Sequence, residues 1–198
     1  MKETQKNRRK HLIAMAEGAI MVALAIVLDL LPLPKWPQGG SVSISAIPII
    51  FFSLRRGSKW GLGAGTVYAV VQMIMGFYAP PANTVWALAA CVLLDYLFAF
   101  ALLGSAAFFA KPFMKSENIA IRSTGYAVGA GAVSLIRFLC SFISGIVLWD
   151  SYAPDGVAVW YYSLTYNGGY MLPNALIAVV CTTLLCTAVD PQTLKRLK

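Results

Sequence analysis

Away from the ends of its long apolar segments, the sequence has three charged residues: Glu17, Asp95 and Arg137. An unpaired charge at membrane depth is costly, so each residue is expected to face a protein interior and to have a partner or a function. Glu17 is close to a basic N-terminal segment, and snorkelling of its side chain towards water is the simpler explanation. Asp95 and Arg137 lie deeper. Two compatible interpretations stay open for them: a structural ion pair, or a carboxylate in a ligand pocket that the arginine holds in place.

One helical face carries further candidates for ligand binding. Residues at a spacing of four share one side of a helix, and the fifth apolar segment has four such residues: Arg137, Ser141, Gly145 and Trp149. Gly145 leaves either a gap beside Trp149 for a flat ligand or a notch for helix packing.

Aromatic residues crowd into one stretch that also carries two carboxylates. The stretch 149–166 contains Trp149, Asp150, Tyr152, Asp155, Trp160, Tyr161, Tyr162 and Tyr166. An interfacial belt of Trp and Tyr is the alternative explanation, but such a belt is spread over all helices. Aromatic faces beside carboxylates suit a cationic, aromatic ligand, through cation–π contact and stacking.

The sequence has no recognisable catalytic or metal-binding motif. His11 is the only histidine, and H-E-x-x-H, G-x-S-x-G and the Gly-rich Walker sequence are absent. The four cysteines have no metal-ligand spacing and are expected to be free, buried thiols. We therefore expect no enzyme activity, no cofactor and no metal, and any ATP dependence must come from a partner.

The composition determines the class of protein that has to position these residues. Of 198 residues, 59% are hydrophobic and 12% are charged, and the mean hydropathy is +0.69. Soluble domains carry about twice that share of charged residues. The composition argues against a soluble enzyme, a disordered chain and a nucleic-acid-binding domain, and predicts an integral membrane protein.

Six apolar segments predict an all-α bundle of six transmembrane helices that forms a single domain over residues 1–198. The segments are 12–32, 42–54, 60–78, 84–110, 119–149 and 168–189. The second is too short to span a bilayer easily and contains Pro48. The only long loop is expected at about 150–167.

The basic residues predict the topology of the bundle. Lys35 is expected on the outer side and Arg137 inside a helix, whereas the other basic residues fall on one side: Lys2, Lys6, Arg8, Arg9, Lys10, Arg55, Arg56, Lys59, Lys111, Lys115, Arg122, Lys195, Arg196 and Lys198. The positive-inside rule then places both termini in the cytoplasm of a multi-pass cell-membrane protein. The net charge of +8 follows from this topology and gives no reason to expect nucleic acid as a partner.

Pairs of small residues four positions apart occur on three predicted helices: Ala19 and Ala23, Gly61 and Gly65, and Gly125 and Gly129. Such pairs let helix backbones approach closely in lipid. Some are expected to pack internally and at least one to face a partner subunit. No internal repeat is visible, which argues against a self-sufficient secondary transporter.

Several motifs together resemble one known family. They are Pro37-Gln38-Gly39-Gly40-Ser41, Ile47-Pro48-Ile49, Ser53-Leu54-Arg55-Arg56-Gly57 and the set Trp149, Tyr162-Ser163-Leu164, Asn167-Gly168. Over about residues 16–180 the chain resembles the thiamine-specific S component, the substrate-binding membrane subunit, of energy-coupling-factor (ECF) vitamin transporters. The resemblance implies a six-helix bacterial plasma-membrane protein that binds thiamine with high affinity near its outer surface. It also implies partners, namely a transmembrane coupling subunit and two cytosolic ATPases.

The resemblance further implies roles for individual residues. Asp95, followed by Tyr96, matches the acidic position that binds the aminopyrimidine, and Trp149 matches the aromatic residue that stacks on thiamine. The remaining matching positions are Tyr162, Asn167, Gly145 and Arg137 in the substrate site and Ala19 and Ala23 in the docking stripe for the coupling subunit.

The chain also departs from the family pattern. Lactococcal-type members carry Glu where this chain has Asp95, and His where it has Ser141. Trp36 is about three positions from the place of the first-loop Trp in a direct alignment, and it remains a candidate for the substrate site. The departures leave open an S component for a thiamine analogue, a thiamine precursor or another vitamin such as riboflavin. A small self-sufficient secondary transporter is the other alternative.

Overall fold

The computed structural model describes residues 2–37 and 39–194, and this part of the chain folds into helices. In chain order they are α1 (Lys2–Asp29), α2 (Ala46–Arg56), α3 (Ser58–Gly76), α4 (Val85–Cys91), the π-helix η1 (Val92–Phe98), α5 (Ala99–Ala101), the 3-10 helix η2 (Leu102–Ser105), α6 (Ala106–Ala110), α7 (Ile119–Val147), the 3-10 turn η3 (Asp150–Tyr152) and α8 (Val159–Ala188). Lys35 and Ser41 form an isolated bridge in the loop between α1 and α2. The expected all-α fold class is confirmed.

Four helical stretches in the described residues are long and apolar enough to cross a membrane: Gln5–Asp29, Val85–Ala110, Ile119–Val147 and Val159–Ala188. Helix α2 has 11 residues and is about 16 Å long, too short to span the hydrocarbon core. Large apolar side chains are exposed around the bundle, among them Ile74, Leu176 and Leu184. An apolar outer surface is what contact with lipid requires, and the chain is a multi-pass membrane protein.

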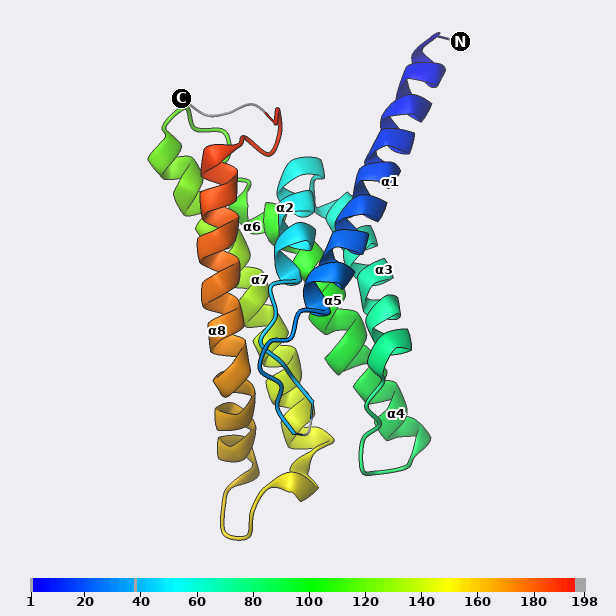
Figure 1. The fold of residues 1–198 in the computed structure, drawn as a ribbon, viewed down its shortest axis with the longest axis vertical. Helices are drawn as coiled ribbons and strands as arrows, with labels where there is room; N and C mark the ends of the chain where they lie inside the picture. The colour runs from blue at the N-terminus through cyan, green and yellow to red at the C-terminus, as the bar shows by residue number, and fades with distance from the viewer. Residues whose placement is uncertain (1, 38, 195–198) are drawn as a thin grey trace.

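The basic segments gather at one end of the molecule. Figure 1 shows the start of α1, the α2–α3 junction, the α6–α7 connection and the end of α8 at this end. The opposite end carries the α3–α4 and α7–α8 connections. Four residues named in the sequence analysis lie outside the described residues: Gln38, Lys195, Arg196 and Lys198.

The predicted starts of three helices differ from the observed ones by four residues or more. Helix α1 begins at Lys2 and not near residue 12, α2 begins at Ala46 and not at 42, and α8 begins at Val159 and not at 168. The long loop expected at 150–167 is therefore wrong in its second half. Tyr162, Tyr166 and Tyr170 lie four residues apart on α8 and pack ring against ring, with centroids 5.6 and 6.3 Å apart. This spacing reflects a helix in a stretch that composition alone assigned to a loop.

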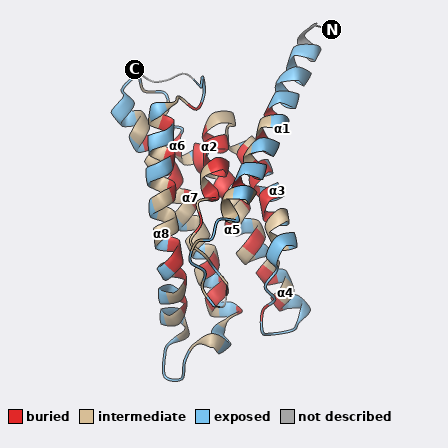
Figure 2. Cartoon of the chain, in the orientation of Figure 1, coloured by how far each residue is buried: buried red, intermediate tan, exposed pale blue. Residues whose placement is uncertain are grey.

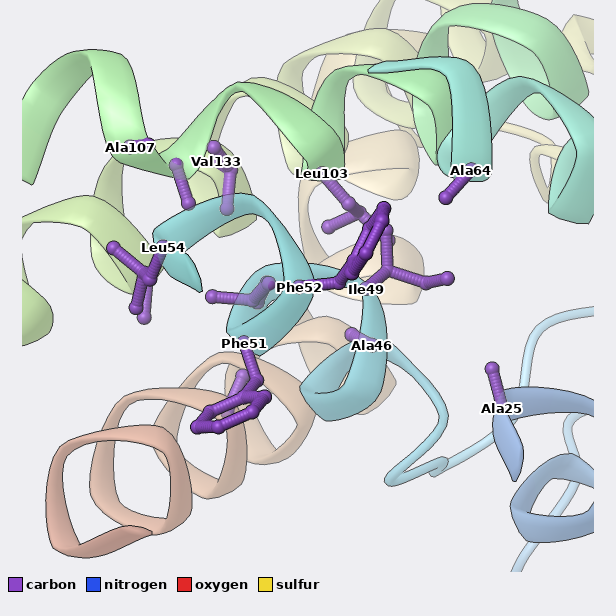
Figure 3. Packing of buried hydrophobic residues seen from close by; sticks show 14 of the residues in the cluster. Ala25, Ala46, Ile49, Phe51, Phe52, Leu54, Ala64, Leu103, Ala107 and Val133 are labelled. Atoms are coloured by element: carbon purple, nitrogen blue, oxygen red, sulfur yellow. The ribbon is translucent and has the colours of Figure 1, made fainter. Parts of the chain in front are cut away.

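Helix α2 occupies the centre of a tightly packed apolar core. Ile49, Phe52 and Leu54 are almost fully buried and, as Figure 3 shows, lie among side chains of the surrounding helices such as Leu103 and Val133. Pro48 is in the first turn of α2, where a missing backbone N–H costs nothing. The buried residues of this cluster concentrate towards the middle of the bundle (Figure 2). We call the region around α2, made of cluster residues such as Ile49, Phe52 and Leu103, the closed half.

Glycine allows two backbones of the closed half to touch. A Cβ atom added at Gly61 on α3 would collide with the carbonyl oxygen of Gly104 on η2, and one added at Gly65 would lie 2.7 Å from the carbonyl oxygen of Ala101. The Ser53 hydroxyl supports this contact, because it donates to the Gly104 oxygen over 2.5 Å and accepts from the Ala107 N–H over 3.1 Å. Close helix approach in lipid depends on such small residues.

The three small-residue pairs have different surroundings. Gly61 and Gly65 pack internally, and so do Gly125 and Gly129, where an added Cβ would meet Phe113 or Ala106. Ala19 and Ala23 of α1 are exposed. Of the three pairs, only the alanine pair is therefore available to a partner.

Glu17 does not extend towards water, and this expectation was wrong. Its carboxylate accepts hydrogen bonds of 2.8 and 2.9 Å from Arg55 and of 2.6 and 2.7 Å from Arg56. Arg55 also donates to the carbonyl oxygen of Pro191, over 3.0 Å. These contacts tie α1, the end of α2 and the segment after α8 together, because two guanidinium groups can satisfy all the acceptor positions of one carboxylate.

Candidate ligand-binding site

A cavity of about 460 Å³ lies beyond the closed half, on the side of the α1–α2 and α7–α8 connections. Its walls come from the end of α1, the loop 30–45, the last turns of α3, η1, and the facing parts of α7 and α8. The cavity is lined by all nine residues predicted for the substrate site: Trp36, Asp95, Tyr96, Arg137, Ser141, Gly145, Trp149, Tyr162 and Asn167. Its volume is in the range of small-molecule sites. We call this region the cavity half.

Asp95 projects from the π-helical turn η1. Such wide turns are rare and often occur at functional sites, because they displace the side chains that follow. The Asp95 Oδ2 atom accepts a hydrogen bond of 2.6 Å from the Ser144 hydroxyl and one of 3.2 Å from the Trp149 indole N–H. Two neutral donors therefore orient the carboxylate.

Of the two interpretations left open for Asp95 and Arg137, the ion pair is wrong, and in the other it is Ser144 and Trp149, not the arginine, that orient the carboxylate. The ion pairs of the described residues link Glu17 to the two arginines of α2 and Asp190 to Arg122. The Arg137 guanidinium lies instead over the ring of Phe100, with its carbon 4.5 Å from the ring centroid. A cation–π contact of this kind holds a charge inside an apolar bundle without a carboxylate.

Trp149 lies outside the helix to which its spacing assigned it. Helix α7 ends at Val147, yet Trp149 still lines the same cavity as Arg137. Its ring stacks on Tyr152 at 5.9 Å and 15° and packs against Tyr78 at 5.4 Å. A hydrogen bond with Tyr78 raises the pKa of the Tyr152 phenol above its ordinary value. The three rings form an uncharged aromatic wall next to Asp95.

The predicted residues on α7 and α8 are engaged mainly with each other. A Cβ atom at Gly145 would collide with the Ser163 side chain and lie 3.1 Å from the Asn167 amide nitrogen. Gly145 is thus a packing notch, and the space beside it is filled. The Asn167 amide donates to the carbonyl oxygens of Ser163 and Ser141, over 3.0 and 3.3 Å, and its oxygen accepts from Tyr170.

Tyr96 connects η1 to the end of α3 through its hydroxyl group. Its hydroxyl donates to the carbonyl oxygen of Gly76 over 3.1 Å and accepts from the N–H of Tyr78 over 2.8 Å. These bonds fasten the end of α3 and the residues after it to η1. They thereby place the Tyr78 ring against Trp149.

The loop 30–45 covers one side of the cavity and carries Trp36 into it. Trp36 packs against Tyr170 with ring centroids 5.8 Å apart. The Tyr166 hydroxyl donates to the carbonyl oxygen of Gly39 over 2.9 Å. The side chain of Asn174 accepts from the Ser43 N–H over 2.7 Å and donates to the Ser41 carbonyl over 2.8 Å. Helix α8 therefore holds the loop in position.

Sequence reasoning missed several cavity residues. Gln72, Tyr170 and Asp29 line the cavity, and Ser144 orients Asp95. Gln72 and Ser144 are polar residues inside apolar segments, and this signal could have identified them. Asp29 is the last residue of α1, and its two partners, Ser43 and Gln72, are distant from it in the sequence.

Together, the fold and the cavity define a helical membrane protein with a ligand-sized cavity lined by carboxylates and aromatic rings. The sequence matches the family described as thiamine transporter protein (Thia_YuaJ) over residues 15–194. It is 41% identical to the thiamine transporter ThiT of Bacillus subtilis (strain 168), over 96% of this chain and 97% of that protein. It is 31% identical to the thiamine transporter ThiT of Lacticaseibacillus paracasei, over 93% of this chain and 92% of that protein.

The chain belongs to the thiamine transporter protein (Thia_YuaJ) family. A solved structure of ThiT from Listeria monocytogenes has the same fold, with a TM-score of 0.73, 21% identity and coverage of 89% of this chain and 94% of that one. The resemblance found in the sequence is confirmed. The family consists of transporters, and the chain is not an enzyme.

Proposed function

We propose that the chain is the high-affinity thiamine-binding subunit of an ATP-driven ECF vitamin transporter. The observation that carries this proposal is the Asp95 carboxylate, fixed beside the aromatic wall of Trp149, Tyr78 and Tyr152 in a ligand-sized cavity. The names of the two relatives, both thiamine transporters, support thiamine as the ligand.

The geometry suggests how the cavity recognises thiamine. The aminopyrimidine carries N–H donors, and Asp95 offers a carboxylate that is oriented by Ser144 and Trp149. The aromatic wall supplies faces for stacking and for cation–π contact with the thiazolium ring. The walls of the proposed site also include the other seven predicted residues: Trp36, Tyr96, Arg137, Ser141, Gly145, Tyr162 and Asn167.

Thiamine binding is tested by identifying what the purified protein carries. Mass spectrometry of the small molecules released from the purified protein should detect thiamine. Calorimetry of ligand-free protein should show tight binding of thiamine and far weaker binding of riboflavin and of the free pyrimidine precursor. Preferred binding of riboflavin or of the precursor would assign the chain to a different vitamin.

The proposed partners are a transmembrane coupling subunit and two cytosolic ATPases. Ala19 and Ala23 support this part of the proposal, because they form an exposed small-residue stripe on α1. Replacing both with Trp should abolish co-purification of the coupling subunit, since bulky rings prevent close helix approach. Thiamine binding by the isolated protein should survive.

A matched control for the docking test is Leu176→Trp, which places the same ring on the exposed face of α8. This variant should assemble normally. An unchanged complex formed by the Ala19 and Ala23 double variant would contradict the docking role of α1.

The proposed topology is a single domain in the bacterial plasma membrane that crosses the bilayer six times with both termini in the cytoplasm. The second crossing needs the loop before α2 together with α2, because α2 alone is too short. The gathering of basic segments at the end that carries the start of α1 and the end of α8 supports this topology (Figure 1). Proteolytic removal of an N-terminal tag in inside-out but not in right-side-out vesicles is the expected result.

A further inference from the structure

A second carboxylate, Asp29, lines the cavity at the end of α1. Its Oδ1 atom accepts a hydrogen bond of 2.7 Å from the Ser43 hydroxyl, and its Oδ2 atom accepts one of 2.7 Å from the side-chain amide of Gln72. Both donors are neutral, so they fix the carboxylate without cancelling its charge. None of the ion pairs of the described residues involves Asp29.

Asp29 is held from three directions. Ser43 is buried and precedes α2, and its N–H donates to Asn174 of α8. Gln72 belongs to the last turns of α3 and also donates to Tyr68. The position of the Asp29 carboxylate is thus set by α1, α3 and the loop that α8 holds, and a ligand meets a negative charge that is already oriented.

The two carboxylates of the cavity have different surroundings. Asp95 belongs to η1 and shares its hydrogen bonds with Ser144 and Trp149 on the α7 side. Asp29 belongs to α1 and contacts Ser43 and Gln72. Of the two basic residues that line the cavity, Arg137 packs on Phe100 and Lys35 is exposed on the loop. Two carboxylates that lack ion pairs and share one cavity favour the entry of a cation, because opposite charge stabilises both.

We propose that Asp29 is a specificity-determining residue that selects the fixed positive charge of the ligand's thiazolium ring. This inference rests on the proposed function. A quaternary thiazolium nitrogen has no N–H to donate, so it is recognised by charge and by aromatic faces and not by a hydrogen bond. Each Asp29 oxygen already accepts one hydrogen bond from a neutral donor. The Ser144 and Trp149 donors of Asp95 both bond to its Oδ2 atom and leave the Oδ1 atom to other donors. Asp95, which lies next to the aromatic wall, is left for the N–H donors of the pyrimidine.

The test measures the affinity of two ligands for two proteins by calorimetry. The ligands are thiamine and a neutral isostere of thiamine whose ring lacks the charge. The proteins are the parent and Asp29→Asn. In this variant the side-chain NH2 can donate to the Ser43 hydroxyl, which then accepts in place of donating, while the side-chain oxygen still accepts from the Gln72 amide, so the packing is retained. Asp29→Asn should weaken thiamine binding at least tenfold and change binding of the neutral isostere by less than twofold.

Two further variants serve as controls. Asp150→Asn removes the same charge from an exposed residue that does not line the cavity, and it should leave both affinities unchanged. Asp29→Glu keeps the charge and should retain the preference for thiamine over the isostere, which tests the inference independently of how well Asp29→Asn folds.

The outcomes separate this inference from the proposed function. Equal losses for both ligands in Asp29→Asn would show that Asp29 only shapes the loop, and unchanged thiamine binding would show that it has no role. Either result overturns the inference while thiamine binding by the parent stands. A parent protein that does not bind thiamine would overturn the proposed function and the inference together.

Discussion

The closed half and the cavity half are built largely from the same long helices, which pack closely in the first and enclose a cavity in the second. In the closed half, α2 fills the centre, and Gly61 and Gly104 bring two backbones into direct contact. In the cavity half, α2 is absent, and the loop 30–45 takes its place as a cover over about 460 Å³ of space. A short second helix thus fills one end of the bundle and leaves the other end open to a ligand.

Polar groups are distributed differently in the two halves. In the closed half, Ser53 lies inside the apolar cluster and is satisfied by backbone groups. In the cavity half, Asp29 and Asp95 accept hydrogen bonds from neutral side chains, and neither takes part in the ion pairs of the described residues. Substitutions in the closed half are therefore expected to lower the free energy of unfolding, whereas substitutions in the cavity half are expected to lower the affinity for the ligand.

The largest expected effect is on stability in the closed half. Gly61→Leu introduces a side chain where the Gly104 carbonyl leaves no room for a Cβ atom. The free energy of unfolding should fall by about 3 kcal/mol, the upper end of the usual range for overpacked sites. Thermal unfolding in detergent measures this. Gly63→Leu on the same helix, where an added Cβ meets nothing within 4 Å, is the control, and equal melting temperatures would refute the close-contact explanation.

The next effect is on binding in the cavity half. Trp149→Ala should cost about 2 kcal/mol of thiamine affinity, since the ligand loses the indole face. Trp149→Phe should retain part of this energy. Trp160→Ala removes the same side chain from an exposed position that does not line the cavity. Fluorescence titration should show weaker binding in Trp149→Ala alone, and a similar loss in Trp160→Ala would remove Trp149 from the site.

The smallest expected effect tests whether stability and ligand binding depend on separate halves of the molecule. Ser53→Ala deletes one hydroxyl that bridges Gly104 and Ala107 and should lower the free energy of unfolding by about 1 kcal/mol. Ser123→Ala, an exposed hydroxyl on α7, should be neutral. Thiamine affinity should stay at the parental value in both variants. A drop in affinity for Ser53→Ala would mean that the halves are coupled.

The sequence was sufficient for properties that depend on composition. Apolar segments and basic residues predict a helical membrane bundle because the bilayer selects for length and charge directly. Five of the nine candidate residues of the substrate site were found from charge and helical spacing, namely Asp95, Arg137, Ser141, Gly145 and Trp149. The others came from the aromatic stretch or from the resemblance to a family, and all nine line one cavity.

Properties that depend on tertiary contacts were beyond the sequence. The glycine pairs of α3 and α7 and the alanine pair of α1 look alike as patterns, yet the glycines pack internally and the alanines are exposed. The partner of Asp95 proved to be Ser144 and not Arg137, since the π-helical turn η1 changes the direction in which the side chain projects. Asp29 could not be identified from the sequence because its partners, Gln72 of α3 and Ser43 of the loop before α2, contact it only in the folded chain.

The central claim is that the cavity half binds thiamine through the carboxylate of Asp95. The most direct measurement is a calorimetric titration of thiamine into the parent and into Asp95→Asn, a change that removes the charge at nearly constant size. Hydrogen bonds to charged groups contribute about 1.5–3 kcal/mol, so the variant should bind thiamine about 10- to 150-fold more weakly. Binding by Asp95→Asn that equals the parent's would contradict the account, because the carboxylate would then serve only to position Ser144 and Trp149.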